Sequence, residues 1–326
     1  MLITHLITGG GGFIGSHLAD ALLARGDRVI AFDNLSTGRL ENLEDACRSP
    51  AFRFVQASVL DFQAVDEAVA EADVVVHLAA AVGVKLIVEQ PLKSLVTNVR
   101  GSEILLDTAH RHRRKILLAS TSEIYGRNPA VPLAETSDRV LGSPSVSRWA
   151  YSTSKAVDEI LGLAYHKERG LPTVVARLFN TVGPRQSPAY GMVIPRLVRQ
   201  ALAGEPMTVF GDGRQTRCFC HVIDVVDALL RLLDHPAAEG DVFNVGSTEE
   251  VSILELARRI KGRTGSRSKI RLVPYDEAYE VGFEDMARRV PEIAKIAALT
   301  GWRPTRVLDE ILDETIAEAR LQQQYA

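Results

Sequence analysis

A glycine-rich turn between an apolar segment and a helical pattern constrains this chain most. The turn reads TGGGGFIG and follows the apolar segment Leu2–Thr8. Its glycines Gly9, Gly12 and Gly15 recur at every third position, which permits a tight turn, close approach of a pyrophosphate to the backbone and close helix–strand packing. The amide groups that open the expected helix Phe13–Arg25 would then face the phosphates. The pattern therefore predicts a dinucleotide site.

An acidic residue follows the second expected strand, Arg28–Phe32. A carboxylate at Asp33 can accept hydrogen bonds from the adenosine ribose and repels a 2′-phosphate, which favours NAD over NADP. The alternative is an acid that only starts a loop, and the spacing from the glycine turn favours the ribose role. The chain would continue around the adenosine through Asn34, Ser36, Thr37 and Gly38.

Apolar strands and helical periods alternate through the first half of the chain. This alternation predicts an α/β fold of the Rossmann type, in which a doubly wound parallel sheet is covered on both faces. Further strands are expected at Phe52–Gln56, Val74–Leu78, Lys115–Ala119 and Thr173–Arg177, and further helices at Phe62–Glu71, Leu92–Arg111 and Trp149–Arg169.

After Asn180 the pattern loosens, and a smaller C-terminal lobe is expected. Helices are expected at Val193–Ala203, Val222–Asp234, Ile253–Thr264 and Val307–Ala319, and Val242–Val245 is expected to return to the sheet. We expect a dinucleotide-binding domain over residues 1–179 and about 219–246. The substrate lobe would comprise residues 180–218 and 247–326.

Composition excludes several classes of protein. With 326 residues, a net charge of -3 and a pI near 6.3, the chain gives no reason to expect nucleic acid or a membrane as partner. Three cysteines are too few for a disulfide framework and indicate a reducing, cytoplasmic location. Cys218 and Cys220 lack a second pair of zinc ligands, so we expect two buried thiols and no metal site. We see no secretion signal and no apolar run of ~18 residues.

A tyrosine and a lysine stand four positions apart in YSTSK, early in an expected helix. This spacing places Tyr151 and Lys155 on one helical face. A phenol has a pKa of about 10, and we expect the ammonium of Lys155 and a cationic nicotinamide to lower it. Tyr151 could then take a proton from a substrate hydroxyl while hydride leaves. The alternative is an ordinary pair on a helix surface.

These motifs together resemble the extended short-chain dehydrogenase/reductase family of sugar-nucleotide epimerases, dehydratases and decarboxylases. The other stretches that carry the resemblance are HLAA, STSEIYG, RLFNTVGPR and FGDGRQTR. Ser58 departs from the family pattern, which has an aspartate beside the adenine. The resemblance implies a homodimer formed through the helices Leu92–Arg111 and Trp149–Arg169. It implies that NAD contacts Phe13, Ile14, Asp33, Asn34, Ser58, Val59, Leu78, Ala79, Ala80, Asn98, Tyr151, Lys155 and Phe179.

The resemblance also implies a first chemical step, which is oxidation of a nucleotide-linked sugar at C4. Thr121 would hydrogen-bond the C4 hydroxyl and assist Tyr151. Glu123 stands where 4,6-dehydratases and UDP-glucuronate decarboxylases have a glutamate. Ser122, a substrate contact, replaces the aspartate of the dTDP-glucose dehydratases, which argues against loss of the C6 hydroxyl.

A late stretch, GFEDMARRVPEI, resembles the decarboxylases as well, and its Arg289 stands where an arginine is proposed as proton donor. We expect Arg289 to hold the substrate carboxylate. Asn180, Arg185 and Arg217 would surround the diphosphate of a UDP-sugar, and the helix that begins at Val193 would cover the base. One departure counts against decarboxylation, because residues 81–88 lack the usual proline and tyrosine, and Ile87 stands in place of that tyrosine.

The expected activity is therefore NAD-dependent decarboxylation of UDP-glucuronate to UDP-xylose or its 4-keto form. The alternatives are a 4-epimerase of a UDP-sugar or UDP-uronate, a 4,6-dehydratase, and a dinucleotide sensor without catalysis. Glu123 could also be a capping or packing carboxylate, and Arg289 could bind only the diphosphate.

Overall fold

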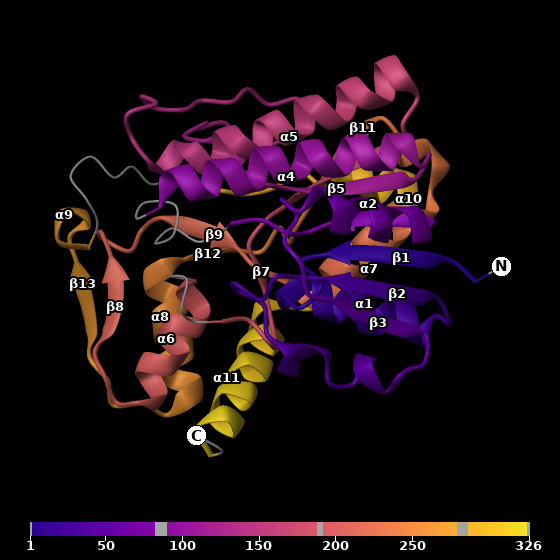
Figure 1. Ribbon diagram of the computed structural model, residues 1–326. Coiled ribbons are helices and arrows are strands. Elements are labelled where there is room, and N and C mark those ends of the chain that lie inside the picture. The colour runs from indigo at the N-terminus through magenta and orange to yellow at the C-terminus, as the bar shows by residue number, and fades with distance from the viewer. Residues whose placement is uncertain (1, 82–89, 188–191, 279–285, 325–326) are drawn as a thin grey trace.

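A seven-stranded parallel sheet forms the centre of the molecule, in the order β11-β6-β5-β4-β1-β2-β3 (Figure 1). The computed structural model describes residues 2–81, 90–187, 192–278 and 286–324. The strands of the sheet are β1 Thr4–Thr8, β2 Arg28–Phe32, β3 Phe52–Val55, β4 Val74–His77, β5 Lys115–Thr121, β6 Thr173–Leu178 and β11 Asp241–Val245.

The strand order reverses direction between β1 and β4. From β1 the chain adds β2 and β3 on one side, and from β4 it adds β5, β6 and β11 on the other. The connections that leave the carboxyl ends of β1 and β4 therefore diverge and leave a crevice at that edge of the sheet. Ligands bind at such a switch point in open α/β sheets. The glycine turn follows β1 and lies at this edge.

Helices cover both faces of the sheet, as predicted. On one face α1 Phe13–Ala24, α7 Val222–Asp234 and α10 Ala294–Thr300 pack on alternate strand residues. On the other face lie α2 Phe62–Glu71, α4 Pro91–Arg111 and α5 Arg148–Arg169, with α4 and α5 side by side (Figure 1). Because both faces of the sheet are covered by helices, the strands carry apolar side chains on both faces. This explains the unbroken apolar runs of the sequence.

A separate apolar core builds the smaller lobe. It joins α6 Val193–Leu202, α8 Ile253–Thr264 and α11 Leu308–Gln324 to the parallel pair β8 Met207–Phe210 and β13 Ile270–Val273. Figure 1 shows these elements grouped at one end of the sheet. The cavity described below lies between the two cores.

The expected elements agree closely with the structure, with one correction to the expected division into lobes. Ile293, Ile296 and Trp302 pack into the core beneath the central sheet rather than into the substrate lobe, because α10 lies against β11. The short pairs β7 Thr181–Val182 with β10 Cys220–His221, and β9 Thr216–Cys218 with β12 Glu250–Ser252, were not predicted. Within the described ranges, the remaining short helices are η1 Leu40–Leu43, η2 Ala46–Arg48, η3 Ser122–Tyr125, η5 Pro236–Ala238 and α9 Tyr275–Ala278.

Local side chains explain where several helices begin. The side chains of Asp61, His221 and Ser252 accept hydrogen bonds from the first amides of α2, α7 and α8. Gly170 ends α5 in the left-handed region, where a residue without Cβ avoids strain. Among the described residues, no helix is both long enough and apolar enough to cross a membrane.

The paired cysteines are buried thiols, as predicted. Cys218 and Cys220 are both fully buried, and neither forms a disulfide. Burial raises the pKa of the Cys218 thiol to about 12, so it stays protonated at neutral pH. Both are therefore small core residues.

Candidate active site

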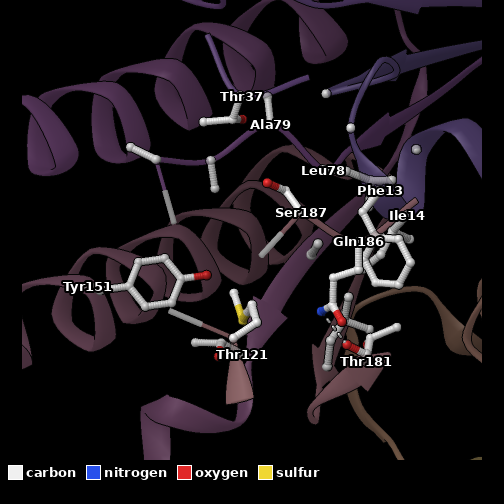
Figure 2. Close-up of a pocket in the computed structure, with 18 of the residues that line it drawn as sticks. Phe13, Ile14, Thr37, Leu78, Ala79, Thr121, Tyr151, Thr181, Gln186 and Ser187 are labelled. Carbon is white, nitrogen blue, oxygen red and sulfur yellow. Dashed lines mark hydrogen bonds between the residues drawn. The ribbon is translucent and has the colours of Figure 1, made fainter. Parts of the chain in front are cut away.

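A cavity of about 1050 Å³ lies at the switch point, between the sheet and the smaller lobe. This volume reaches the upper end of the ~300–1,000 Å³ range of small-ligand sites, as suits two ligands held side by side. Figure 2 shows part of its lining, with Phe13 and Ile14 from α1 and Leu78 and Ala79 after β4.

The structure brings most of the predicted site residues together. They come from the glycine turn, the ends of five strands of the sheet, α5 and the smaller lobe. Those that line the cavity are Gly9, Gly12, Phe13, Ile14, Gly15, Asp33, Asn34, Ser36, Thr37, Ser58, Val59, Leu78, Ala79, Ala80, Thr121, Ser122, Glu123, Tyr151, Lys155, Phe179, Asn180, Arg185, Val193, Arg217 and Arg289.

The glycine turn has the geometry that a pyrophosphate requires. Gly9 adopts a φ of 72°, in the left-handed region. A Cβ on Gly15 would lie 2.2 Å from the carbonyl oxygen of Gly9, so no larger residue fits where α1 meets the turn. Gly9, Gly12 and Gly15 all line the cavity, so the backbone where α1 begins borders it without a side chain at these positions.

Asp33 is buried at the end of β2 and organises the chain around it. One carboxylate oxygen accepts from the Gly11 amide at 3.0 Å and the other from the Leu35 amide at 2.8 Å. Burial raises the pKa of Asp33, and the two amide hydrogen bonds act in the opposite direction. Gly38 does not line the cavity, because it packs behind this carboxylate: a Cβ there would lie 2.8 Å from the Asp33 oxygen.

Asn98 also lies outside the cavity lining. It is buried in α4, accepts from the Ala81 amide at 2.8 Å and donates to the Ser154 hydroxyl at 3.2 Å. Asn98 thus ties the chain that leaves β4 to α5, and a direct contact with NAD stays a prediction.

Tyr151 reaches the cavity from α5, and Figure 2 shows its hydroxyl directed toward the middle of the cavity. The phenol hydrogen-bonds Thr121 at the end of β5. Burial, Glu123 and Asp158 together raise the pKa of Tyr151 well above its usual range. The expectation of a lowered pKa is therefore wrong for the protein alone, in which burial is the largest cause of the rise in the pKa of Tyr151. The Lys155 ammonium itself pairs with Asp158 at 2.9 Å.

The other three predicted catalytic residues meet beside this phenol. Thr121 ends β5 and accepts from the Glu123 amide at 3.2 Å, which begins η3. The Glu123 carboxylate lies 3.4 Å from the Arg289 guanidinium. Arg289 also donates to the Asn180 side chain at 2.7 Å. A carboxylate, a guanidinium and a hydroxyl from distant segments thus share one wall of the cavity.

Sequence reasoning missed the buried network that supports this wall. Arg177 donates to both oxygens of Glu159 at 2.9 and 2.8 Å, and to the Tyr125 hydroxyl at 2.8 Å. Tyr125 donates to Asn244 at 2.6 Å, and Asn244 donates to the backbone of Glu292 at 3.2 Å. This network joins η3 to the segment that carries Arg289. Tyr125 and Arg177 lie in the STSEIYG and RLFNTVGPR motifs, so these motifs were the sequence feature that could have revealed the network.

The smaller lobe adds a wall that was only partly predicted. The Arg196 guanidinium stacks over the Phe210 ring at 4.1 Å, and both residues line the cavity with Tyr275. Phe210 begins the FGDGRQTR motif, so the motif pointed to it. Figure 2 also shows Gln186, which donates to the Thr181 carbonyl at 2.9 Å.

The two arginines expected near a diphosphate already have protein partners. Arg185 pairs with Asp20 on α1 at 2.8 Å. Arg217 donates to the carbonyl of Met286 at 2.8 Å and is buried. Both line the cavity, and their contact with phosphate stays a prediction. Ile87 and residues 282–285, on which part of the resemblance depended, lie outside the described residues.

Comparison with known proteins identifies the family. The family described as the NAD dependent epimerase/dehydratase family matches residues 5–246. The chain belongs to this family. The match runs from β1 to the end of β11, and so includes the glycine turn, Tyr151 and Lys155.

Curated relatives resemble nearly the whole chain. A UDP-N-acetyl-alpha-D-glucosaminuronate decarboxylase of Bacillus cytotoxicus is 40% identical over 312 residues, which cover 95% of this chain and 96% of that protein. UDP-glucuronic acid decarboxylase 1 of Danio rerio is 38% identical, over 95% of this chain and 71% of the relative.

Solved structures of similar proteins share the fold. A UDP-glucose 4-epimerase of Thermotoga maritima, in complex with UDP-glucose, is 31% identical with a TM-score of 0.88, over 98% of this chain and 100% of the other. A UDP-glucuronic acid 4-epimerase of Bacillus cereus, in complex with UDP-glucuronic acid and NAD, is 27% identical with a TM-score of 0.88 and the same coverage.

The Asp33 carboxylate tests the expected choice of cofactor. We expect Asp33→Asn to reduce the ratio of NAD⁺ to NADP⁺ affinity by roughly tenfold or more, because the charge that binds ribose hydroxyls and repels a 2′-phosphate is removed. The asparagine keeps one acceptor for the Gly11 or Leu35 amide. Calorimetric titration with both dinucleotides measures the ratio, and Asp45→Asn, at an exposed carboxylate outside the cavity, is the matched control. An unchanged ratio in Asp33→Asn would contradict the ribose role.

Proposed function

We propose that this protein is an NAD-dependent decarboxylase of UDP-glucuronate that gives UDP-xylose or its 4-keto form. The observation that carries the proposal is the Glu123–Arg289 pair, held at 3.4 Å in the cavity beside Tyr151 and Thr121. A 4-epimerase of a neutral UDP-sugar needs a base and a hydride acceptor, whereas an enzyme that acts on a UDP-uronate also needs a cation to hold the carboxylate. Arg289 is buried and in position for that task.

The first step is oxidation at C4. Bound NAD⁺ supplies a hydride acceptor and the positive charge of its nicotinamide ring. Tyr151 takes the proton of the C4 hydroxyl, and Thr121 orients that hydroxyl through its hydrogen bond to Tyr151. The glycine turn and Asp33 fit the dinucleotide, because Gly9, Gly12 and Gly15 line the cavity and place no side chain between it and the backbone at these positions.

The ketone at C4 makes the sugar a β-keto acid, which loses its C6 carboxylate as CO₂. The electrons of the broken C5–C6 bond delocalise into the C4 carbonyl. Arg289 holds the carboxylate and then stabilises the enolate through a guanidinium of fixed geometry. Glu123 moves a proton to C5 through water. Return of hydride to C4 and of the proton from Tyr151 completes UDP-xylose.

The substrate class rests on the relatives and leaves a second candidate. UDP-glucuronic acid decarboxylases of animals and plants match most of the chain. The relative that is 40% identical and matches over 96% of its length is named for UDP-N-acetyl-glucosaminuronate, which differs at C2 and shares the carboxylate. The chemistry at C4 to C6 is the same for both sugars.

Release of CO₂ tests the proposed reaction directly. We expect the protein with NAD⁺ to release CO₂ from UDP-glucuronate labelled at C6, and Tyr151→Phe to reduce the rate at least ~100-fold because the base is lost. UDP-N-acetyl-glucosaminuronate runs in parallel. Formation of C4 epimers from either sugar without CO₂ would replace the proposal with the 4-epimerase alternative.

Comparison of variants at Arg288 and Arg289 distinguishes a specific role of Arg289 from a general effect of removing positive charge. Arg289→Met should lower kcat for CO₂ release by at least ~100-fold, because the carboxylate and enolate lose a charged donor. Arg288→Met is the control, since Arg288 is exposed and pairs with Glu250 outside the cavity. We expect it to keep nearly full activity. A rise in KM alone for Arg289→Met would instead indicate simple binding of the diphosphate.

We also propose that the protein forms a homodimer through α4 and α5. The adjacent helices α4 and α5 expose large apolar side chains outside the cavity, with Leu92 on α4 and Ile160 on α5 at 74% and 63% exposure. An apolar surface on two packed helices suits an isologous contact between two copies. The buried free thiols fit the proposed cytoplasmic location.

A charge on α5 tests this contact. Ile160→Glu should convert the dimer to a monomer, because the glutamate would be buried without a partner. Light scattering after size exclusion measures the mass. Leu321→Glu, at an apolar residue of similar exposure on α11, should leave the dimer intact. A dimer that persists in Ile160→Glu, or a wild-type monomer, would contradict the proposed interface.

A further inference from the structure

A second acid on the catalytic helix pairs with the lysine of the predicted catalytic pair. Asp158 stands three residues after Lys155, and the carboxylate lies 2.9 Å from the ammonium. The two side chains are only 2% and 3% exposed. Charges buried this deeply interact strongly, because little water screens them.

The charge of Asp158 has few other partners in the part of the chain that the structure describes. One of its carboxylate oxygens binds Lys155, and the other is buried with no hydrogen-bond partner among those residues. The negative charge therefore acts mainly on its surroundings within α5, which include Tyr151.

No other group described around the Tyr151 phenol and the Lys155 ammonium takes over the part that the negative charge of Asp158 plays. Glu123 faces Tyr151 from η3 and adds negative charge, although it pairs with Arg289. His77 faces Lys155 from β4, and its pKa is lowered to about 3, first by burial and then by Lys155, so it is neutral.

The next acid along the helix is already occupied. Glu159 binds Arg177 from β6 through both oxygens and accepts from Ser120 at the end of β5. The Lys155–Asp158 and Arg177–Glu159 ion pairs therefore leave little net charge on the part of α5 near Tyr151.

We propose that Asp158 is a positioning residue that fixes Lys155 and offsets its charge, so that Tyr151 becomes a base only when a cationic nicotinamide lies beside it. The inference rests on the proposed role of Tyr151 in C4 oxidation. Tyr151 would then bind its proton firmly once hydride has left C4 and the ring charge is gone. It would release the proton again when hydride returns to C4 and the ring charge is restored. The proton affinity of the phenol thus follows the oxidation state of the cofactor in both directions.

Titration of the phenol tests the proposal without turnover. The absorbance of tyrosinate is followed against pH in the NAD⁺ complex of the wild type, Asp158→Asn and Asp158→Glu. Each is corrected by its counterpart that also carries Tyr151→Phe. We expect the midpoint for Tyr151 in Asp158→Asn to lie about one pH unit lower, a tenfold rise in the ionisation constant, because a nearby like charge is removed. Asp158→Glu keeps the charge and should keep the wild-type midpoint.

The pH profile of kcat/KM gives a second readout. Activity that needs the phenolate rises with pH through its pKa, so Asp158→Asn should move this limb to lower pH by the same amount. Midpoints and limbs that do not move in Asp158→Asn overturn the proposal, and a lower melting temperature alone then shows a structural role. Failure of the proposed function looks different: no turnover of either uronate by the wild type, whereas the midpoint still shifts in Asp158→Asn.

Discussion

The reversal of strand order between β1 and β4 is the constraint on which the rest of the structure depends. It opens a crevice at the carboxyl edge of the sheet, and the first turn of the chain supplies that crevice with the amides of α1. Because β5 ends at the same edge, Thr121, Ser122 and Glu123 face the same space. The smaller lobe covers this edge from one side, so a sugar nucleotide held by that lobe would meet the dinucleotide at Tyr151.

Paired charges organise the wall at which the chemistry would occur. Lys155 pairs with Asp158, Arg177 with Glu159 and Arg289 with Glu123, and all six side chains are at least mostly buried. A buried charge without a partner is costly, so each pair fixes the geometry of its members. Both members of the Arg289–Glu123 pair line the cavity, so an incoming carboxylate would disturb this pair. The Lys155–Asp158 pair, of which Lys155 lines the cavity, sets the position of the base, and the Arg177–Glu159 pair supports η3.

Local patterns in the sequence were sufficient for the sheet, for most of the helices that cover it and for the predicted site residues, most of which line the cavity. The glycine turn, Asp33 and the Tyr151–Lys155 spacing each depend on residues close together in the chain, where spacing fixes geometry. Contacts between residues far apart in the chain were harder to predict from the sequence. Asn98 and Gly38 lie behind the cavity lining, and Trp302 packs under the sheet. Tertiary packing, which the local sequence pattern does not reveal, decides these positions. The pairing of Lys155 with Asp158, and with it the raised pKa of Tyr151, depends on burial that helical spacing does not reveal.

In the proposed reaction, a sugar carbon would pass hydride to the dinucleotide and take it back during one turnover at Tyr151. Rapid mixing of the NAD⁺-loaded protein with UDP-glucuronate, while the near-ultraviolet absorbance of NADH is recorded, tests it most directly. We expect this absorbance to rise before CO₂ appears and then to fall unless the 4-keto sugar is released, with a slower rise when C4 carries deuterium. Release of CO₂ with no transient NADH and no isotope effect would contradict it.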